Sequence, residues 1–305
     1  MLPMDPRRLE LLLELSRLGS MHEVADALHI TTSTVSQQIA ALAREVGTPL
    51  LEPDGRRVRL TPAGRRLADH AVTVLAAIET ARADLDPDAE PAGEVRVAAF
   101  ATAVRASLLP VVRTLATDHR DVRLRILEHE PSEAMNLLAS DDVDLALTYD
   151  YNLAPGTVDR TADAMPLWET AWGLGVPTGR RRGRGDALAV FDRFRDEDWI
   201  VNSRNTADED VIRTVASLAG FRPRVTHRAD SLELMQDMIV AGLGVGLLPA
   251  AQVTAAGVSL IPLTRPEVLL RAFAVTRRGR AAWPPLALVL ELLGAGPRDQ
   301  HLARR

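Results

Sequence analysis

Residues 20–39, SMHEVADALHITTSTVSQQI, decide the fold at the start of this chain because they hold two short helical patterns joined by a tight turn. Ser20 and Glu23 have the spacing of a capping box, in which the serine oxygen accepts from the amide three residues on and the glutamate reaches back. In residues 33–46, apolar side chains recur at steps of three and four, as on one buried helix face. The stretch therefore predicts a helix-turn-helix.

Small polar side chains open the second of these helices. Thr31 or Thr32 supplies the N-cap. Short hydroxyls and amides at a helix N-terminus can donate to and accept from base edges and phosphates. A compact helical subdomain that does not touch DNA is the alternative. If the segment is a DNA reader, the expected contacts come from Thr31, Thr32, Ser33, Thr34, Ser36 and Gln37.

A basic hairpin follows the two helices. Asp54-Gly55 lies between alternating apolar positions, which is a hairpin signal. Arg56 and Arg57 come directly after the turn, where a wing would touch the DNA backbone or enter the minor groove. We therefore predict that residues 1–60 form a winged helix-turn-helix that binds double-stranded DNA.

Residues 61–85 carry one long helical pattern. Thr61 and Pro62 start a helix well, as N-cap and first helical residue. Apolar side chains then follow at alternating steps of four and three, which is the seam of a coiled coil. This predicts a dimerising helix, although the seam could instead pack on the C-terminal part of the same chain. The seam consists of Leu67, Ala71, Val74, Ile78, Ala81 and Leu85.

The C-terminal two thirds of the chain have an α/β pattern. Residues 86–93 are acidic, contain two prolines and a glycine, and read as a hinge linker. Beyond them, β-like runs at residues 95–99, 122–127 and 144–148 alternate with helical stretches. That alternation predicts a parallel sheet with helices on its faces. The fold class is therefore α/β multidomain.

Composition narrows the classes of function. The 305 residues contain no cysteine, which excludes a disulfide framework and a thiolate metal site and fits a reducing cytoplasm. No apolar run approaches the ~20 residues that span a bilayer, so we expect no membrane association. A net charge of −5 argues against a surface coated in nucleic acid, but it allows a small DNA-reading module.

Taken together, the capped helices, the arginine wing, residues 47–51 (GTPLL) and residues 60–64 (LTPAG) resemble the LysR-type transcriptional regulators. The resemblance implies two Rossmann-like lobes, similar to periplasmic solute-binding proteins, that hold a small-molecule effector between them. Lobe I would cover residues 94–163 and 270–300, and lobe II residues 164–269. The resemblance also implies a homodimer or homotetramer on promoter DNA, with RNA polymerase as a further expected partner.

The sequence departs from the family pattern near the recognition turn. The common Ser-Gln-Pro-Ala-Leu-Ser turn is replaced by residues 31–36, TTSTVS, and an arginine often found after Ser36 is Gln37. The frequent Phe-Glu-Arg before the wing is Leu51-Glu52-Pro53. These changes keep the architecture but leave the operator sequence open.

Ligands of α/β lobes sit beyond the carboxyl ends of the strands, where helix N-termini present their amides. Arg204 follows a strand and could grip a carboxylate in two places, so the effector is expected to be a small carboxylate; an arginine simply exposed there is the alternative. No metal and no other cofactor is expected. The expected effector-binding residues are Ala101, Thr102, Glu130, Thr148, Asn202 and Arg204.

Enzymatic chemistry finds little support in the sequence. Glu128-His129-Glu130 could suggest a metal site, but alternate residues of a strand face opposite sides and no second histidine lies at ligand spacing. Residues 242–246 (GLGVG) follow a helix and precede a strand, the reverse of a dinucleotide-binding loop. We predict a regulator rather than an enzyme. The alternative class is a solute-binding or metabolic protein whose N-terminal helices serve only oligomerisation.

Overall fold

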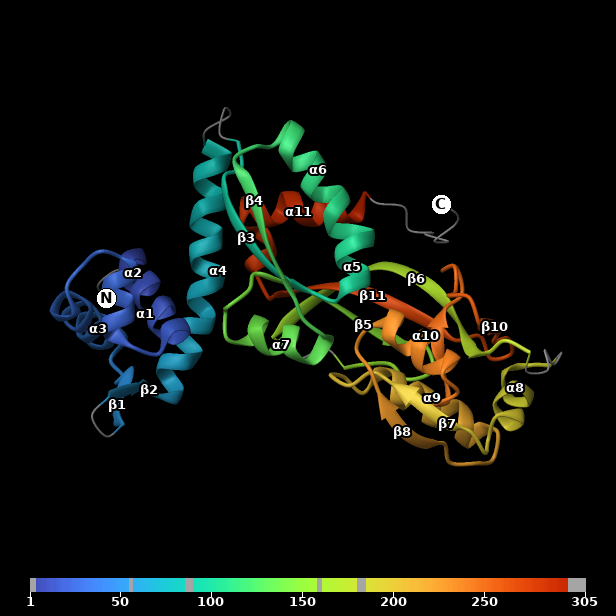
Figure 1. Ribbon diagram of the computed structural model, residues 1–305. Coiled ribbons are helices and arrows are strands. Elements are labelled where there is room, and N and C mark those ends of the chain that lie inside the picture. The colour runs from blue at the N-terminus through green and yellow to red at the C-terminus, as the bar shows by residue number, and fades with distance from the viewer. Residues whose placement is uncertain (1–3, 55–56, 86–89, 158–160, 180–184, 296–305) are drawn as a thin grey trace.

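A computed structural model describes residues 4–54, 57–85, 90–157, 161–179 and 185–295 of the chain. It comprises a small helical head, a long helix beside the head and a larger α/β body (Figure 1). Among the described residues, no helix combines the length and the apolar character needed to cross a membrane.

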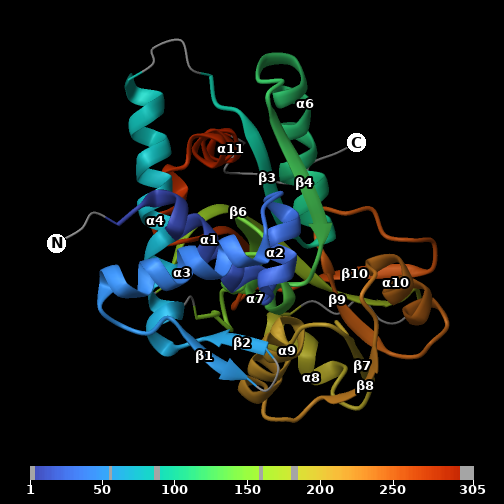
Figure 2. The same ribbon diagram turned by 90° about the vertical axis from the view of Figure 1, so that its left-hand side faces the viewer.

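The head is a winged helix-turn-helix. Its elements are α1 (Pro6–Leu18), α2 (Met21–Ala27), α3 (Thr32–Val46), β1 (Leu51–Asp54) and β2 (Arg57–Leu60). Leu12, Val35 and Leu42 are fully buried in its core. Figure 2 looks onto this head and shows its three helices in front of the body, with the hairpin below them.

Local caps explain where the head's helices begin and end. Gly19 and Gly47 adopt the left-handed conformation that ends α1 and α3, as glycine does most readily. Thr31 is the N-cap of α3, and its hydroxyl accepts from the Thr34 amide at 3.1 Å. The expected capping box at Ser20 is wrong in detail, because the serine oxygen accepts from the amide of His22, two residues on, at 3.3 Å.

The long helix, α4 (Pro62–Leu85), packs within its own chain on two sides. Ala68 and Ala71 join the buried core of the head. Farther along, the hydroxyls of Thr73 and Thr80 donate to the carbonyls of Arg278 and Ala282, at 3.2 and 2.6 Å. Part of the helix therefore packs on the C-terminal part of the same chain, the alternative to a dimer interface, because its small residues allow close approach.

Lobe I of the body surrounds the first half of the sheet. Its strands are β3 (Gly93–Ala99), β4 (Val122–Glu128), β5 (Leu145–Tyr151) and β11 (Leu269–Arg277). Its helical elements are α5 (Ala101–Ala103), η1 (Val104–Leu108), α6 (Leu109–Asp118), α7 (Pro131–Ala139), η2 (Arg280–Ala282) and α11 (Pro284–Gly294).

Lobe II contains the remaining strands and helices of the body. The strands are β7 (Asp198–Val201), β8 (Arg224–Arg228), β9 (Val245–Pro249) and β10 (Val258–Pro262). The helices are α8 (Ala187–Arg193), α9 (Ala207–Leu218) and α10 (Leu232–Val240). Gly242 follows α10 in the left-handed conformation and β9 comes next, so residues 242–246 form a helix-to-strand turn.

One strand, β6 (Ala162–Pro177), runs through both lobes. Its first part pairs with β11 up to Ala171, and its second part pairs with β9 and β10 from Trp172 onward. Within the described residues the sheet order is β4-β3-β5-β11-β6-β9-β7-β8, with β10 beside β6. The sheet is mixed rather than parallel throughout, because β11 and β6 run antiparallel to their neighbours. The change of partner, between Ala171 and Trp172, lies within β6, and the lobe boundary expected at about 163/164 stays a prediction.

Candidate DNA-reading surface and inter-lobe site

The opening turn of α3 presents its polar side chains to solvent. Thr32, Ser33, Ser36 and Gln37 are exposed. Thr31 is also exposed, but its hydroxyl caps the helix and lies 2.8 Å from the Thr34 hydroxyl. The Gln37 side-chain amide donates to the Ser33 hydroxyl at 3.5 Å, a long hydrogen bond between two exposed side chains. Exposed hydroxyls and amides at a helix N-terminus can read base edges and phosphates.

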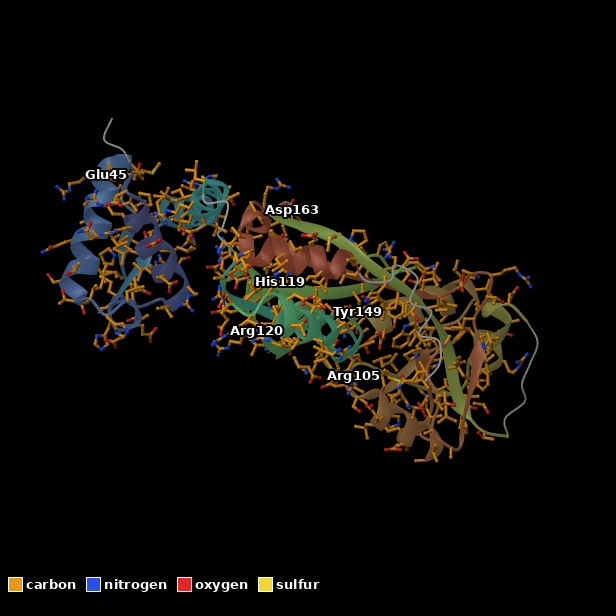
Figure 3. All side chains as sticks on the ribbon, turned by 90° about the horizontal axis from the view of Figure 1, so that it is seen from above. Glu45, Arg105, His119, Arg120, Tyr149 and Asp163 are labelled. Carbon is orange, nitrogen blue, oxygen red and sulfur yellow. The ribbon has the colours of Figure 1, made fainter. Side chains whose placement is uncertain are left out.

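The opposite face of α3 is fixed against α1. Val35, Ile39 and Leu42 are buried there. Arg8 of α1 donates to the Gln38 side chain at 2.9 Å and forms an ion pair with Glu45, which Figure 3 labels. These contacts set the orientation of α3 on the head. Sequence reasoning missed Arg8, because the thirty-odd residues between it and its partners carry no local signal.

Only part of the predicted wing can be placed. Arg56 lies outside the described residues, and of Arg57 only the backbone, the first residue of β2, is described. Arg59 forms an ion pair with Glu52 across the hairpin at 2.8 Å. The basic character of this hairpin is therefore partly neutralised within the head.

The dimerising seam needs one correction. Ala71 is fully buried in the head's own core, so its predicted place on an exposed seam is wrong. Val74 and Leu85 are 41 % and 84 % exposed, and Leu67 and Ile78 are half-buried. Leu67 packs against the head's core, so the apolar strip that stays exposed or half-exposed on α4 consists of Val74, Ile78 and Leu85.

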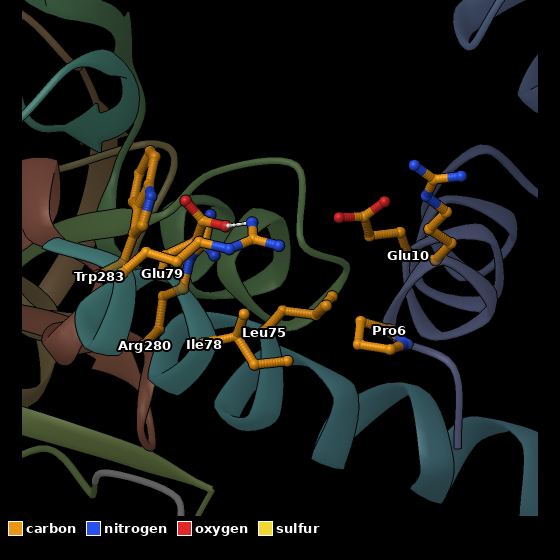
Figure 4. A pocket seen from close by; sticks show the side chains of 9 residues that line it. Pro6, Glu10, Leu75, Ile78, Glu79, Arg280 and Trp283 are labelled. Carbon is orange, nitrogen blue, oxygen red and sulfur yellow. Dashed lines mark hydrogen bonds and ion pairs between the residues drawn. The ribbon is translucent and has the colours of Figure 1, made fainter. Parts of the chain in front are cut away.

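A cavity of about 410 Å³ lies where the head, α4 and lobe I meet. Figure 4 shows Pro6 and Glu10 of α1 on one side and Trp283 and Arg280 on the other, with Leu75 and Ile78 of α4 between them. The Arg280 guanidinium stacks on the Trp283 ring, with its central carbon 4.2 Å from the ring centroid. Both apolar and charged groups line the cavity.

Three predicted effector residues come together where the lobes face each other. Glu130 is the N-cap of α7 in lobe I, and its side chain accepts from the Tyr149 hydroxyl at 3.1 Å. Asn202 and Arg204 lie in the loop after β7 in lobe II. The Asn202 side-chain oxygen accepts from the Arg204 amide at 2.8 Å, which shapes this loop.

Arg204 is neither free nor simply exposed. Its Nε donates to Glu133 at 3.2 Å, and its Nη2 pairs with the other oxygen of the same carboxylate. Because these bonds favour the ionised form, the pKa of Glu133 falls to about 2. Arg204 therefore binds a carboxylate through two nitrogens, as expected, but this carboxylate is the side chain of Glu133 in the same protein.

The other predicted effector residues lie apart from this group. Ala101 and Thr102 form the short α5 after β3 and are half-buried. Thr148 is buried on β5 and, because strand residues alternate, faces the side opposite to Tyr149. Tyr149, and not Thr148, is therefore the side chain that reaches Glu130, and a role for Thr148 in effector binding stays a prediction.

Two further hydrogen-bonded groups, one at Tyr149 and one at Tyr151, connect the lobes. The Asn205 amide donates to the Tyr149 hydroxyl at 2.7 Å and also to Glu130. The Tyr151 hydroxyl donates to Asp208 at 2.9 Å. Period-two alternation puts Tyr149 and Tyr151 on one face, a signal that sequence reasoning could have used. No local pattern pairs them with Asn205 and Asp208.

At the other end of β5, charged residues join lobe I to α4. Asp144 accepts two hydrogen bonds from the Arg96 guanidinium, each 3.0 Å, and pairs with Arg280 at 3.0 Å. Arg277 of β11 bridges Asp141 in lobe I and Asp69 on α4, at 3.2 and 2.6 Å. The described residues contain no group of three or more His, Asp or Glu placed to hold a metal.

Comparison with known proteins agrees with this architecture. Residues 6–65 match the bacterial regulatory helix-turn-helix of the lysR family, and residues 88–297 match the LysR substrate binding domain. The transcriptional dual regulator GltC of Bacillus subtilis is 26 % identical over 270 residues, 84 % of this chain and 88 % of that protein. A probable hydrogen peroxide-inducible genes activator of Mycobacterium avium is 30 % identical over 264 residues, 84 % of this chain and 79 % of that protein.

A solved structure shows the same fold over the full length. A cysteine-substituted, full-length OxyR from Pseudomonas aeruginosa superimposes with a TM-score of 0.73 at 19 % identity, covering 100 % of this chain and 98 % of that one. The predicted winged helix-turn-helix and two-lobed body are therefore confirmed. The chain belongs to the LysR-type transcriptional regulators, DNA-binding proteins with an effector-binding substrate domain.

Proposed function

We propose that this regulator reads its operator with the first turn of α3, through Thr32, Ser33, Ser36 and Gln37. The observation that carries the proposal is the contrast between the two sides of this helix. Its polar opening turn is exposed, whereas Val35 and Ile39 behind it are fully buried and hold it in place. Side chains on a rigid support discriminate base edges better than side chains on a mobile loop.

A gel-shift series with full-length protein and DNA from upstream of its own coding region tests this proposal. Gln37→Ala should change base preference. Arg66 is an exposed arginine near the start of α4, directly after the hairpin, and we take it as a contact to the DNA backbone. Arg66→Ala should therefore weaken binding to all sequences while lowering the salt slope by about one. Arg195→Ala, just after α8 in lobe II, serves as the control. Equal binding by all four proteins would reject α3 as the reading helix.

We further propose that the protein binds DNA as a homodimer or homotetramer held through α4. Val74, Ile78 and Leu85 support this because they form an apolar strip that the described parts of the chain leave exposed or half-exposed. Ile78 of this strip also lines the cavity between the head, α4 and lobe I. Sedimentation of Val74→Asp should show a monomer, and an unchanged association state would exclude this strip.

A small carboxylate is the effector that we propose for the cleft between the lobes. Arg204 supports it, because its guanidinium already holds a carboxylate in two places, that of Glu133. A bound effector would take the place of Glu133. Small carboxylates should raise the melting temperature of the parent protein and not that of Arg204→Ala. A carboxylate that stabilises both proteins equally would show that Arg204 is not the anchor.

We infer that the protein works as a cytoplasmic regulator rather than an enzyme, with RNA polymerase as a further partner at the promoter. Support comes from the family and from the inter-lobe residues, which contact one another rather than forming a nucleophile with its base. Although relatives include a peroxide-inducible activator, the 305 residues contain no cysteine. A response to peroxide through a thiol is therefore not open to this sequence.

A further inference from the structure

The two lobes touch through a small group of polar side chains at the end of β5. Tyr149 and Tyr151 contribute from lobe I, and Asn205 and Asp208 contribute from lobe II. Tyr149 lies at the junction between the two lobes in Figure 3. Both hydrogen bonds cross the boundary, at 2.9 Å for Tyr151 to Asp208 and 2.7 Å for Asn205 to Tyr149.

Asp208 is buried at this junction without a cation. Its residue is 5 % exposed, and within the described parts of the chain its carboxylate forms no ion pair. It accepts from the Tyr151 hydroxyl and the Asn202 backbone amide, both neutral donors. Arg204, the arginine of the junction, is bound to Glu133 instead.

The titratable groups that face Asp208 make its charge still less favourable. Tyr149 and Tyr151 approach from β5, and Glu130 approaches from the start of α7. Glu130 is itself held by neutral donors, and burial raises its pKa. Asp208 and Glu130 belong to different lobes, so the repulsion between their charges acts directly on the contact between the lobes.

We propose that a proton is a ligand of this junction: it binds Asp208 when the lobes are closed, and its release weakens the contact between them. Separation of the lobes would return the carboxylate to water and move it away from Glu130. Regulation by acidity would then be an input to the regulatory domain besides its effector. Its meaning for transcription depends on the proposed function, but the linkage itself does not.

The direction and size of the effect follow from linkage. Burial raises the pKa of Asp208 to about 6, against an ordinary value of 3.8 that a water-exposed carboxylate would regain in the open form. The closed form therefore binds the proton more tightly, and acidification favours closure. The ratio of closed to open molecules should be about tenfold higher at pH 5 than at pH 8.

The distance between the lobes can be measured because the chain has no cysteine of its own. Spin labels attached through Ala116→Cys on α6 and Ser217→Cys on α9, both exposed positions, would report the distance by pulsed electron paramagnetic resonance. Full-length protein without DNA is used at pH 5 and pH 8. The short-distance population should fall as the pH rises, and a pH-independent distribution would overturn the proposal.

Two variants separate Asp208 from a general effect of pH. Asp208→Asn should hold the lobes closed at both pH values, whereas Asp210→Asn, an exposed neighbour on the same helix, should behave like the parent. If Asp208→Asn does not fold, Glu130→Gln provides the second test, because loss of its charge should move the transition to lower pH. A pH response that persists unchanged in the Asp208 or Glu130 variant would contradict the proposal.

The outcome of the distance measurement is independent of the outcome of the gel shift that tests the proposed function. The distance measurement contains no DNA, so an inactive reading helix would leave it intact. Conversely, a gel shift at one fixed pH does not depend on the protonation of Asp208.

Discussion

Two buried aspartates at opposite ends of β5 have opposite electrostatics. Asp144, just before the strand, is 2 % exposed and is bound by Arg96 and Arg280. Asp208, bound to Tyr151 at the other end of the strand, is 5 % exposed and has only neutral partners. Burial opposes ionisation at both sites, yet the two arginines outweigh it at Asp144 and lower its pKa, whereas the pKa of Asp208 rises.

Burial alone does not determine the charge of a carboxylate. The cations around it decide whether the site is a fixed anchor or one that can change its protonation. Asp144 lies where lobe I meets α4, since its partner Arg280 belongs to η2, which packs on that helix. Asp208 lies where the lobes meet. The anchor is at the side of the DNA-binding head, and the adjustable group is at the contact between the two lobes.

The largest effect is expected for Asp144→Asn. Neutralising this carboxylate leaves Arg96 and Arg280 without their anion in a buried site, which should reduce the free energy of unfolding by about 3–5 kcal/mol. Chemical denaturation at pH 7 measures it, with the exposed Asp142→Asn as the matched control. A loss no larger than that of the control would remove the distinction between the two aspartates.

Asp208→Asn should act in the opposite direction. Burial raises the pKa of Asp208 in the folded protein to about 6, above its ordinary value of 3.8. The protonated side chain therefore contributes its full stabilisation below about pH 3.8, and this stabilisation is lost as the pH rises through 6. Replacing the carboxylate by an amide should therefore increase the free energy of unfolding at pH 8 by about 1–3 kcal/mol and change it little at pH 4. Denaturation curves across this pH range measure the difference, and a constant difference would contradict it.

Tyr151→Phe should have a smaller effect. The substitution keeps the ring packed but removes the hydroxyl that donates to Asp208, so the loss should be about 1 kcal/mol at pH 5 and larger at pH 8, where the acceptor is charged. Denaturation at both pH values tests this. Equal losses at the two pH values would show that Asp208 does not change its charge between them.

The smallest effect is expected for Asp69→Asn on α4. Its carboxylate pairs with Arg277 but is itself 61 % exposed, and such surface pairs contribute below about 1 kcal/mol. Arg277 also keeps Asp141 as a partner. A loss above 2 kcal/mol in denaturation would mean that the anchor between α4 and lobe I depends on this pair rather than on Asp144.

The head was predictable because its signals are local. Gly19 and Gly47 end helices, Thr31 caps α3, and the spacing of Val35, Ile39 and Leu42 defines a buried face. Each of these depends on residues within a few positions. The α/β class followed in the same way from alternating strands and helices, whereas the two lobes and their order came from the resemblance to LysR-type regulators.

The inter-lobe site was predictable only in part, because its partners are far apart in sequence. Glu130 and Arg204 were found from their places after strands. Glu133, whose carboxylate binds the Arg204 guanidinium, lies 71 positions from Arg204 in the sequence. Ala71 was assigned to the dimer seam because its spacing fits, while only the packing of α1 shows that it is buried. Spacing identifies an apolar face but not which partner covers it.

The most direct test of the central claim, that the first turn of α3 reads DNA sequence, is selection from a random pool of duplexes with full-length protein. The parent should enrich a motif of two related half-sites about one helical turn apart. Gln37→Ala should enrich a motif that differs in each half-site, while Arg195→Ala should enrich the parent's motif. Enrichment of no sequence by the parent, or of the same motif by Gln37→Ala, would contradict the claim.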